Sequence, residues 1–173
     1  MVLKFLSVPS WILIHCWDML SGNATEPNEG SLAALLDNNI NTYYHTLWSG
    51  ASPGGKPHYL QINLNQSISF FAVEYHGRGG GGLAGDVKRA GIWVSKTGND
   101  IDAEWIKAGI ITFDMTTPKN ERFKMNEQVL YLGEEYKYIR YIPEARRNAD
   151  PLDPSGTVGW WYAADMFFYT FDL

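Results

Sequence analysis

The sequence has almost no cysteine and no surplus of basic side chains. Cys16 is the only cysteine in 173 residues, so the chain cannot form an internal disulfide. Its 14 lysine and arginine residues are outnumbered by 19 aspartate and glutamate residues, which gives a formal net charge of −5. Binding to nucleic acid phosphates requires clustered basic side chains, and the pair Arg146-Arg147 lies alone in a predicted loop. We therefore expect no nucleic acid partner.

The sequence also lacks a long hydrophobic run. A membrane-spanning helix needs roughly 20 consecutive apolar residues, and no stretch approaches that length. The N-terminal residues MVLKFLSVPSWILIHC have the outline of a secretion signal, but Pro9 and the flanking Trp11 and Trp17 make it a poor one. We expect residues 10–17 to form the first strand, with Cys16 as a buried thiol. A piece of a longer secreted protein would equally show no signal.

The sequence also lacks the metal-binding and phosphate-binding motifs of common enzymes. The zinc-protease pattern H-E-x-x-H is absent, and the glycines at 79–82 lack the lysine, hydroxyl residue and following helix of a phosphate-binding loop. A hydrolase would need two carboxylates facing each other in a deep cleft, and the spacing of Asp86, Asp114 and Glu144 predicts no such pair. We expect the protein not to be an enzyme.

What the sequence does contain is aromatic residues and short strand-like segments. Aromatics reach 14%, with seven tryptophans and ten tyrosines. Alternating or β-branched segments predict strands, and segments rich in glycine, proline and asparagine predict turns. The predicted strands cover residues 10–17, 58–64, 68–75, 87–95, 105–113 (with an interruption at Gly109), 121–132, 136–142 and 160–171, and the main loops cover 21–30, 49–57, 77–85 and 144–159. Eight or nine strands with one helical turn indicate a single all-β domain over residues 1–173, an antiparallel β-sandwich or jelly roll.

The stretch LAALLDNNINTYYHTLW, residues 32–48, combines a polar loop with a run of aromatic residues. A short apolar turn ends at Asp37, and the loop from Asp37 to Thr42 offers a carboxylate, a hydroxyl and several carbonyls. Ca²⁺ takes about 6–8 oxygen ligands, so a second segment would have to contribute. The alternative is an ordinary turn, in which Asp37 and Thr42 hydrogen-bond to the local backbone.

Several loop residues have the chemistry that sugar binding requires. An aromatic face packs against the C–H groups of a pyranose, and planar polar side chains bind its hydroxyls. Residues of these types in or next to predicted loops are Tyr44, His45, Trp48, His76, Arg78, Asp86, Trp160, Trp161 and Tyr162. Taken singly, each is more readily explained as core or ordinary surface than as a ligand contact. The pair Trp160-Trp161 is harder to dismiss, because neighbouring side chains of a strand point to opposite faces and an exposed tryptophan needs a reason.

At these residues the chain resembles the F5/8 type C (discoidin-like) domains, particularly family 32 carbohydrate-binding modules. The segments that carry the resemblance are ALLDNNINTYYHTLWSG, HYLQINL and AVEYHGR, with lesser support from IWVSKTG, KYIRY and AADMFFY. The family loop reads D-G-D/N-x-x-T-x-W-H-T. Asp37 and Thr42 keep its five-residue step, and Tyr44-His45-Thr46 stands where W-H-T is usual. The resemblance implies a galactose-binding-domain-like jelly roll.

The resemblance also implies a structural Ca²⁺ that joins the Asp37 loop to the last strand. The implied ligands are the carbonyls of Ala34, Asn39, Thr42 and Ala164, the Thr42 hydroxyl, and the carboxylates of Asp37 and Asp165. Asp165 stands where the family usually has glutamate, which is one methylene longer.

For sugar binding, the resemblance assigns His45 and Arg78 to the hydroxyls and Trp160 or Trp161 to the stacking ring. Trp48 and Tyr44 are placed at the rim, although Tyr44 matches a family position that often belongs to the core. Galactose-binding members usually have an asparagine shortly after the arginine, and residues 79–85 contain none. Galactose-type sugars are therefore the first candidates, and the sequence does not fix the sugar.

The function implied is a non-catalytic glycan-binding module of a larger extracytoplasmic protein, secreted or at the cell surface. The alternative is an adhesion module that binds a phospholipid surface or a protein through the aromatics of the 48–57 loop and the Trp160-Trp161 pair. A concave site where His45, Arg78 and one tryptophan converge favours sugar. Separated aromatic side chains at one end favour a membrane or protein.

Overall fold

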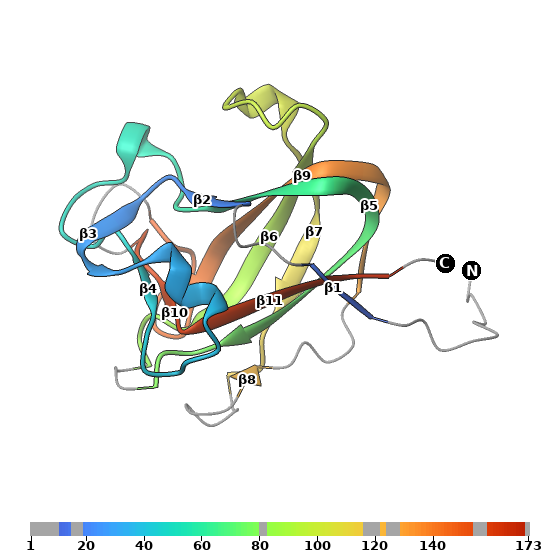
Figure 1. Cartoon of the computed structure of the whole chain (residues 1–173). Helices are drawn as coiled ribbons and strands as arrows, with labels where there is room; N and C mark the ends of the chain where they lie inside the picture. Colours follow the sequence, from blue (N-terminus) through green and yellow to red (C-terminus); the bar gives the residue numbers. More distant parts are fainter. Residues whose placement is uncertain are drawn as a thin grey trace.

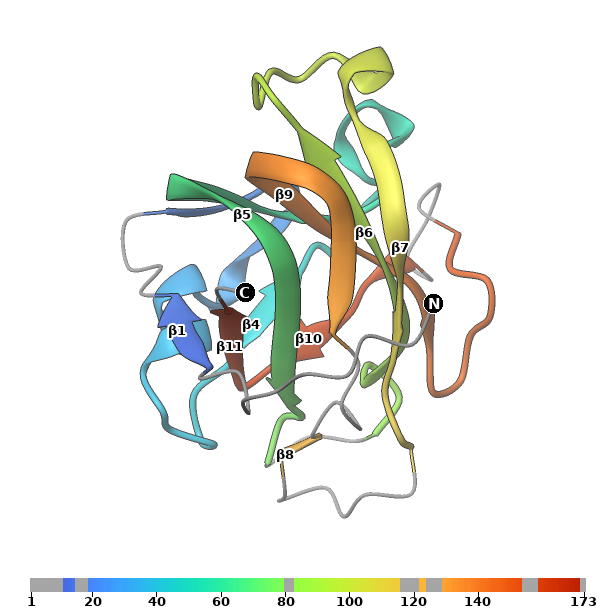
Figure 2. The same ribbon diagram turned by 90° about the vertical axis from the view of Figure 1, so that its right-hand side faces the viewer.

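The structure is a computed structural model that describes residues 11–14, 19–79, 83–115, 129–153 and 159–171, together with the backbone of residues 122–123. The strands form two antiparallel sheets packed as a sandwich (Figure 1; Figure 2). The predicted all-β sandwich is confirmed. Within the described residues, no helix has the length and apolar character that crossing a membrane requires.

The larger sheet has the strand order β1-β11-β5-β9-β6-β7, with β2 and β8 also pairing with β5. Its strands are β1 (Ile12–Ile14), β2 (Leu20–Gly22), β5 (Leu60–His76), β6 (Val87–Ser95), β7 (Ile106–Thr112), β8 (Arg122–Phe123), β9 (Leu130–Arg146) and β11 (Asp165–Thr170). The long strands β5 and β9 are visibly curved (Figure 2), and their pairing shifts register between Asn63 and Ile68. Because of this curvature, β5 pairs with β2 near its start and with β11 near its end.

The smaller sheet has the order β10-β4-β3, formed by β3 (Thr25–Gly30), β4 (Tyr44–Thr46) and β10 (Tyr162–Ala163). It lies at one end of the sandwich (Figure 1). The three helical turns are η1 (Leu32–Leu36), η2 (Pro53–Gly55) and η3 (Asp102–Glu104). The predicted helical turn at residue 32 is η1, which packs against β4 and β11.

The core lies between the sheets and is built from the inward side chains of both. Trp161 is fully buried and packs edge-on against Tyr44 and Tyr141, with ring centroids 5.6 and 5.8 Å apart. The Thr46 hydroxyl accepts a hydrogen bond from the Trp161 amide at 2.8 Å and donates to the Trp161 carbonyl at 3.1 Å. Burying aromatic side chains of this size dominates core energetics, and the contact of Trp161 with Tyr141 of β9 joins the small sheet to the large one.

The structure differs from the sequence prediction mainly in how strands are divided. Residues 58–64 and 68–75 were predicted as two strands and form the single strand β5. The predicted strand at 160–171 is instead split at Ala164 between β10 and β11, which belong to different sheets. The interruption predicted at Gly109 is wrong, because β7 runs unbroken through this residue, and only its pairing with β6 shifts register between Gly109 and Lys107. The predicted buried thiol, Cys16, lies outside the described residues.

The prediction of a loop over residues 21–30 is wrong, because β2 and β3 lie there. Proline, asparagine and glycine in this segment favour turns locally, but β3 is held by its pairing with β4. Gly30 makes this close approach possible. Its φ is +79°, and a Cβ at this position would lie 2.4 Å from the Tyr43 carbonyl oxygen.

Candidate functional site

Three side chains meet at Glu29 of β3. Glu29 Oε1 accepts hydrogen bonds from the Tyr43 hydroxyl at 2.8 Å and from Arg78 Nη1 at 3.0 Å. Glu29 Oε2 accepts one from Trp48 Nε1 at 2.9 Å. The Arg78 guanidinium also lies over the Tyr43 ring, 3.6 Å from its centroid. These contacts gather an acid, a base and two aromatic rings at the surface.

The hydrogen bonds keep Glu29 charged. The Tyr43 hydroxyl contributes most, followed by the Trp48 indole and then Arg78, and together they hold the pKa of Glu29 below its ordinary value despite partial desolvation. Both Glu29 and Arg78 are partly exposed, and exposed ion pairs contribute little to stability. The network therefore fixes side-chain positions more than it stabilises the fold.

His45 lies beside this network on β4. It is 5% exposed, and its pairing partner across the small sheet is Tyr162 of β10. Its ring centroid lies 5.2 Å from that of Trp160 and 5.6 Å from that of Tyr162. The Arg78 guanidinium lies 6.0 Å from the centroid of the same Tyr162 ring, so His45 and Arg78 flank one aromatic side chain.

The protonation state of His45 follows from its contacts. Nδ1 lies 2.6 Å from the Thr46 carbonyl, which can only accept, so Nδ1 carries the hydrogen. Burial lowers the pKa of His45 below its ordinary value, and the imidazole is neutral at pH 7. Nε2 is then a hydrogen-bond acceptor.

Two tryptophan rings border the cluster. Trp48 is 45% exposed, and its indole N–H is tethered to Glu29. Trp160 is half-buried, with the guanidinium of Arg146 3.8 Å from its ring centroid and Arg146 Nη1 donating to its carbonyl at 3.1 Å. We call the set Glu29, Tyr43, His45, Trp48, Arg78 and Trp160 the Glu29 site.

Two of the predicted sugar contacts need correction. Tyr44 and Trp161 are fully buried and pack against each other, so neither ring can reach a ligand at the surface. Adjacent strand residues face opposite sides, and here Trp161 faces the core while Trp160 turns toward His45. The structure brings the remaining candidates, His45, Arg78, Trp48 and Trp160, to one end of the molecule.

Sequence reasoning missed Glu29 and Tyr43. Glu29 was assigned to a loop, and no local pattern distinguishes it from other surface carboxylates. It reaches Tyr43 and Trp48 only because β3 pairs with β4, and its nearest partner in the sequence is 14 residues away. Tyr43 directly precedes β4, and its hydroxyl rather than its ring face contacts Glu29.

The Asp37 loop is closed by its own side chains. Asp37 Oδ1 accepts from the Asn39 amide at 2.9 Å, and Oδ2 accepts from the Thr42 hydroxyl at 2.6 Å. Asn38 takes the left-handed conformation, with φ of +56°. These bonds are those expected of an ordinary turn, and they also gather the oxygens of Asp37 and Thr42 in one place.

Asp165 supplies a second reason to consider a cation here. It is 1% exposed, and its Oδ1 has no hydrogen-bond partner in the part of the chain that the structure describes. Oδ2 lies 3.6 Å from His76 Nδ1. A buried carboxylate oxygen without a partner is costly, and a hard cation would satisfy it. Since β11, which begins at Asp165, packs against η1, the residues present fit a Ca²⁺ held between these segments.

The predicted ligand set is mostly carbonyl and hydroxyl oxygen. Among the described residues, no group of three or more His, Cys, Asp or Glu side chains gathers at one point. Ala34, Asn39, Thr42 and Ala164 would therefore have to provide most of the ligand oxygens, with Asp37 and Asp165 supplying the charge.

The Asp37 loop also contacts the segment that carries Arg78. The Gly79 amide donates to the Ile40 carbonyl at 3.3 Å. A Cβ at Gly79 would lie 2.8 Å from Ile40 Cγ1 and 3.1 Å from its carbonyl oxygen, so a larger residue would displace Ile40. The loop thereby fixes the backbone next to Arg78.

One hydrolase-like pattern does occur in the chain. Residues 50–54 read G-A-S-P-G, which matches the G-x-S-x-G pattern around a nucleophilic serine. That pattern acts on a sharp turn from a strand into a helix, whereas Ser52 is followed by the three-residue turn η2. Ser52 is buried, and its hydroxyl donates to the Lys56 carbonyl. The serine therefore has a structural role in its own loop.

Comparison with known proteins agrees with the fold. A family 32 carbohydrate-binding module of Clostridium perfringens NanJ, solved with galactose, superposes with a TM-score of 0.60 at 18% identity, covering 92% of this chain and 99% of that one. The C. perfringens module CpGH89CBM32-5, solved with GalNAc-β-1,3-galactose, gives 0.52 at 19% identity, covering 86% and 92%. The C-terminal domain of a Bacteroides fragilis chitobiase gives 0.54 at 23% identity, covering 94% and 95%.

At these identities the likeness establishes the fold, which is that of a family 32 carbohydrate-binding module. No curated protein matches the chain in sequence. The family model of the F5/8 type C domain matches residues 21–152, from β2 to beyond the end of β9. Because this match covers most of the sequence, the chain belongs to the F5/8 type C domain family.

Proposed function

We propose that the protein is a non-catalytic module that binds a glycan at the Glu29 site. The observation that carries the proposal is the convergence of Glu29 and Arg78 beside the exposed ring of Trp48, with His45 joined to Arg78 through the Tyr162 ring. A sugar requires this combination, because its hydroxyls need fixed donors and acceptors while its C–H face needs an aromatic ring.

Each side chain has a distinct role in this proposal. Arg78 donates hydrogen bonds from its guanidinium, while the Glu29 carboxylate and His45 Nε2 accept them from sugar hydroxyls. Trp48 offers its ring face, and the bond from its indole N–H to Glu29 sets the angle of that face. The side chains are held by one another before any ligand arrives, which lowers the entropic cost of binding.

We propose a galactose-type sugar as the ligand. Two structural relatives were solved with galactose and with GalNAc-β-1,3-galactose. Glu29 and Arg78 neutralise each other, which suits an uncharged sugar. The family's usual asparagine after the arginine is absent from residues 79–85, so the donors and acceptors of the Glu29 site would have to supply selectivity.

The same geometry argues against the adhesion alternative. A module that inserts aromatic side chains into a phospholipid surface needs apolar side chains that project freely. Trp48 is instead tied to a charged carboxylate, and Trp160 packs between His45 and Arg146.

A structural Ca²⁺ held by Ala34, Asp37, Asn39, Thr42, Ala164 and Asp165 completes the proposal. The unpartnered Oδ1 of Asp165 supports it, and the contact between Gly79 and Ile40 connects this loop to Arg78. We further propose that the module belongs to a larger extracytoplasmic protein that it brings to polysaccharide or glycoconjugate. One structural relative is the C-terminal domain of a chitobiase, which supports such an attachment.

A glycan array with the wild-type chain and with Arg78→Ala tests the proposal. We expect binding to glycans that end in galactose or GalNAc, and loss of that signal in the variant. Lys96→Ala is the matched control, because it removes another exposed ion pair, with Glu134, on a different part of the surface. Absence of binding to any glycan would contradict the proposal. Binding to phospholipid vesicles in its place would support the adhesion alternative.

A further inference from the structure

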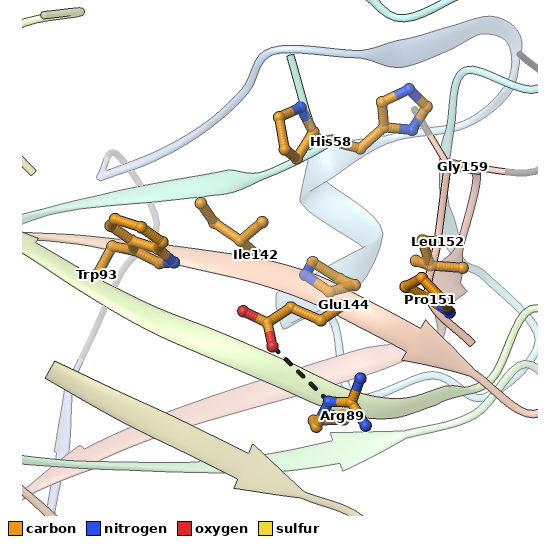
Figure 3. A pocket seen from close by; sticks show the side chains of 10 residues that line it. His58, Arg89, Trp93, Ile142, Glu144, Pro151, Leu152 and Gly159 are labelled. Carbon is orange, nitrogen blue, oxygen red and sulfur yellow. Dashed lines mark ion pairs between the residues drawn. The ribbon is translucent and has the colours of Figure 1, made fainter. Parts of the chain in front are cut away.

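The outer face of the large sheet contains a pocket that the proposed function does not use. On β6 the side chains of Ala90, Ile92 and Val94 face the core, so Arg89 and Trp93 face outward. A cavity of about 300 Å³ lies over these residues and the end of β9. Figure 3 shows His58 on one side of it, with Arg89, Glu144 and Trp93 on the other.

Two polar groups are buried in the walls of this pocket without a partner. His58 is 2% exposed, and neither of its ring nitrogens has a hydrogen-bond partner among the described residues. The indole nitrogen of Trp93 is buried and equally lacks one there. Each unpaired buried group costs free energy, so a bound molecule toward which these two side chains turn would recover that cost.

The pocket also holds a fixed pair of charged groups. Glu144 is held by Lys107 Nζ at 2.5 Å and by Arg89 Nε at 3.7 Å. Arg89 Nη2 is bonded in turn to Asp150 at 2.9 Å. Lys88 Nζ also lies 3.2 Å from Asp150, so every charged group in this cluster already has a partner of opposite charge.

A glycine makes room for this arrangement. A Cβ at Gly91 would lie 2.4 Å from Glu144 Oε1 and 3.0 Å from Trp93 Nε1. Glycine inside a strand weakens the strand and marks a place where another group comes close. Here it lets the Glu144 carboxylate and the Trp93 indole lie directly over the sheet.

We propose that this pocket is a second carbohydrate site, which takes one uncharged pyranose ring. The rings of Trp93 and three prolines, with Ile142 and Leu152, provide apolar surface for the C–H face of the sugar. His58, the Trp93 N–H, Arg89 and Glu144 provide donors and acceptors for its hydroxyls. The volume is at the lower end of small-molecule sites and suits a single ring. The proposal does not depend on ligand binding at the Glu29 site.

The test uses the indole N–H signals of the seven tryptophans in a proton–nitrogen NMR titration of the full chain. The probes are the methyl glycosides of galactose, glucose and mannose. Trp93→Phe and Trp48→Phe assign the two signals that matter. We expect the Trp93 signal to move and saturate with at least one sugar. Arg78→Ala should abolish movement at Trp48 and leave the response of Trp93 intact.

His58→Phe is the second variant. It keeps a ring of similar shape and removes both unpaired nitrogens, and we expect it to weaken saturation at Trp93 by about tenfold, the loss of one or two hydrogen bonds. It should leave Trp48 unaffected, and an unchanged Trp48 response shows that the variant is folded.

The outcomes separate the two sites. If Trp48 responds to sugar while Trp93 stays still or drifts without saturating, the second site is wrong and the Glu29 site stands. If Trp93 saturates while Trp48 does not respond, the second site stands and the proposed function at the Glu29 site fails. If no indole signal moves with any of the three sugars, both are overturned.

Discussion

The Glu29 site and the outer-face pocket contain the same kinds of residue but differ in how their polar groups are hydrogen-bonded and in how far their tryptophan is exposed. Each brings a tryptophan together with paired acidic and basic side chains. In the Glu29 site the polar groups are bonded to one another and Trp48 is open to solvent. In the pocket, His58 and the Trp93 indole are buried without partners among the described residues. The first keeps its shape by itself, while the second requires an occupant to satisfy it.

The two regions also differ in what supports them. The pocket floor is formed by the adjacent strands β6 and β9, which are paired from Val87 to Ser95 of β6. The Glu29 site instead combines β3, β4 and loop residues, and Arg78 is positioned next to the Asp37 loop through Gly79. We therefore expect the Glu29 site to respond to changes in that loop, and the pocket to respond to changes in its own walls.

The largest expected effect is a loss of folding stability in acid, caused by the unpaired His58 of the pocket. Burial, and to a lesser extent the charge of His45, lowers the pKa of His58 to about 4. Above about pH 6.5 the folded and unfolded chains both carry neutral His58. Between about pH 6.5 and 4 only the unfolded chain takes up the proton. The free energy of unfolding should therefore decrease as the pH is lowered, by up to about 3 kcal/mol. Urea midpoints measured across this range check it.

The comparison variant is His58→Phe, which should flatten this pH dependence. Protonation of carboxylates with lowered pKa values, such as Glu29, also lowers the stability of the fold in acid. This loss is the same in the wild type and in the variant. Parallel curves for the wild type and the variant would show that His58 does not titrate in this way.

Removal of Ca²⁺ should affect the Glu29 site and leave the outer-face pocket unchanged. We expect EDTA to lower the melting temperature by roughly 5–10 °C, the effect of losing a well-occupied site, and to weaken glycan binding at the Glu29 site. The sugar response of Trp93 should persist. Asp165→Asn removes a proposed ligand charge and should make the melt insensitive to EDTA. An unchanged wild-type melt in chelator would count directly against the ion.

Truncation of the exposed ring should weaken only the Glu29 site. Trp48→Ala removes the stacking surface, and we expect a loss of about 2 kcal/mol, roughly 30-fold in affinity, measured by calorimetry with a galactose-terminated oligosaccharide. Stability should change little, since the side chain is 45% exposed. Tyr131→Ala is the control, because it removes another exposed ring, on β9 of the large sheet. Equal losses in both variants would point to a general effect on folding.

The smallest effect should come from neutralising the carboxylate that holds the Glu29 site together. Glu29→Gln keeps the shape but weakens the bonds from Tyr43, Arg78 and Trp48, and we expect glycan affinity to fall about tenfold. The free energy of unfolding should change by less than about 1 kcal/mol, because these contacts are partly exposed. Glu134→Gln, at another exposed ion pair, is the control and should leave affinity unchanged.

Local patterns in the sequence were sufficient for much of the fold. The alternation of Ala90, Ile92 and Val94 predicted a strand over residues 87–95, and β6 has these bounds. The adjacent Trp160 and Trp161 were expected on opposite faces, and one is buried while the other borders the Glu29 site. These features depend on side-chain period and burial, which are written in neighbouring residues.

The structure decided what depends on contacts between distant segments. β3 exists because it pairs with β4, and that pairing carries Glu29 to Arg78, 49 residues away. The outer-face pocket joins His58 to Trp93 and to Leu152, which no sequence spacing connects. The sequence determined the family, the strands and most of the polar and aromatic side chains available for binding. Only the tertiary structure decided which of them meet, because strand pairing between distant segments sets those neighbours.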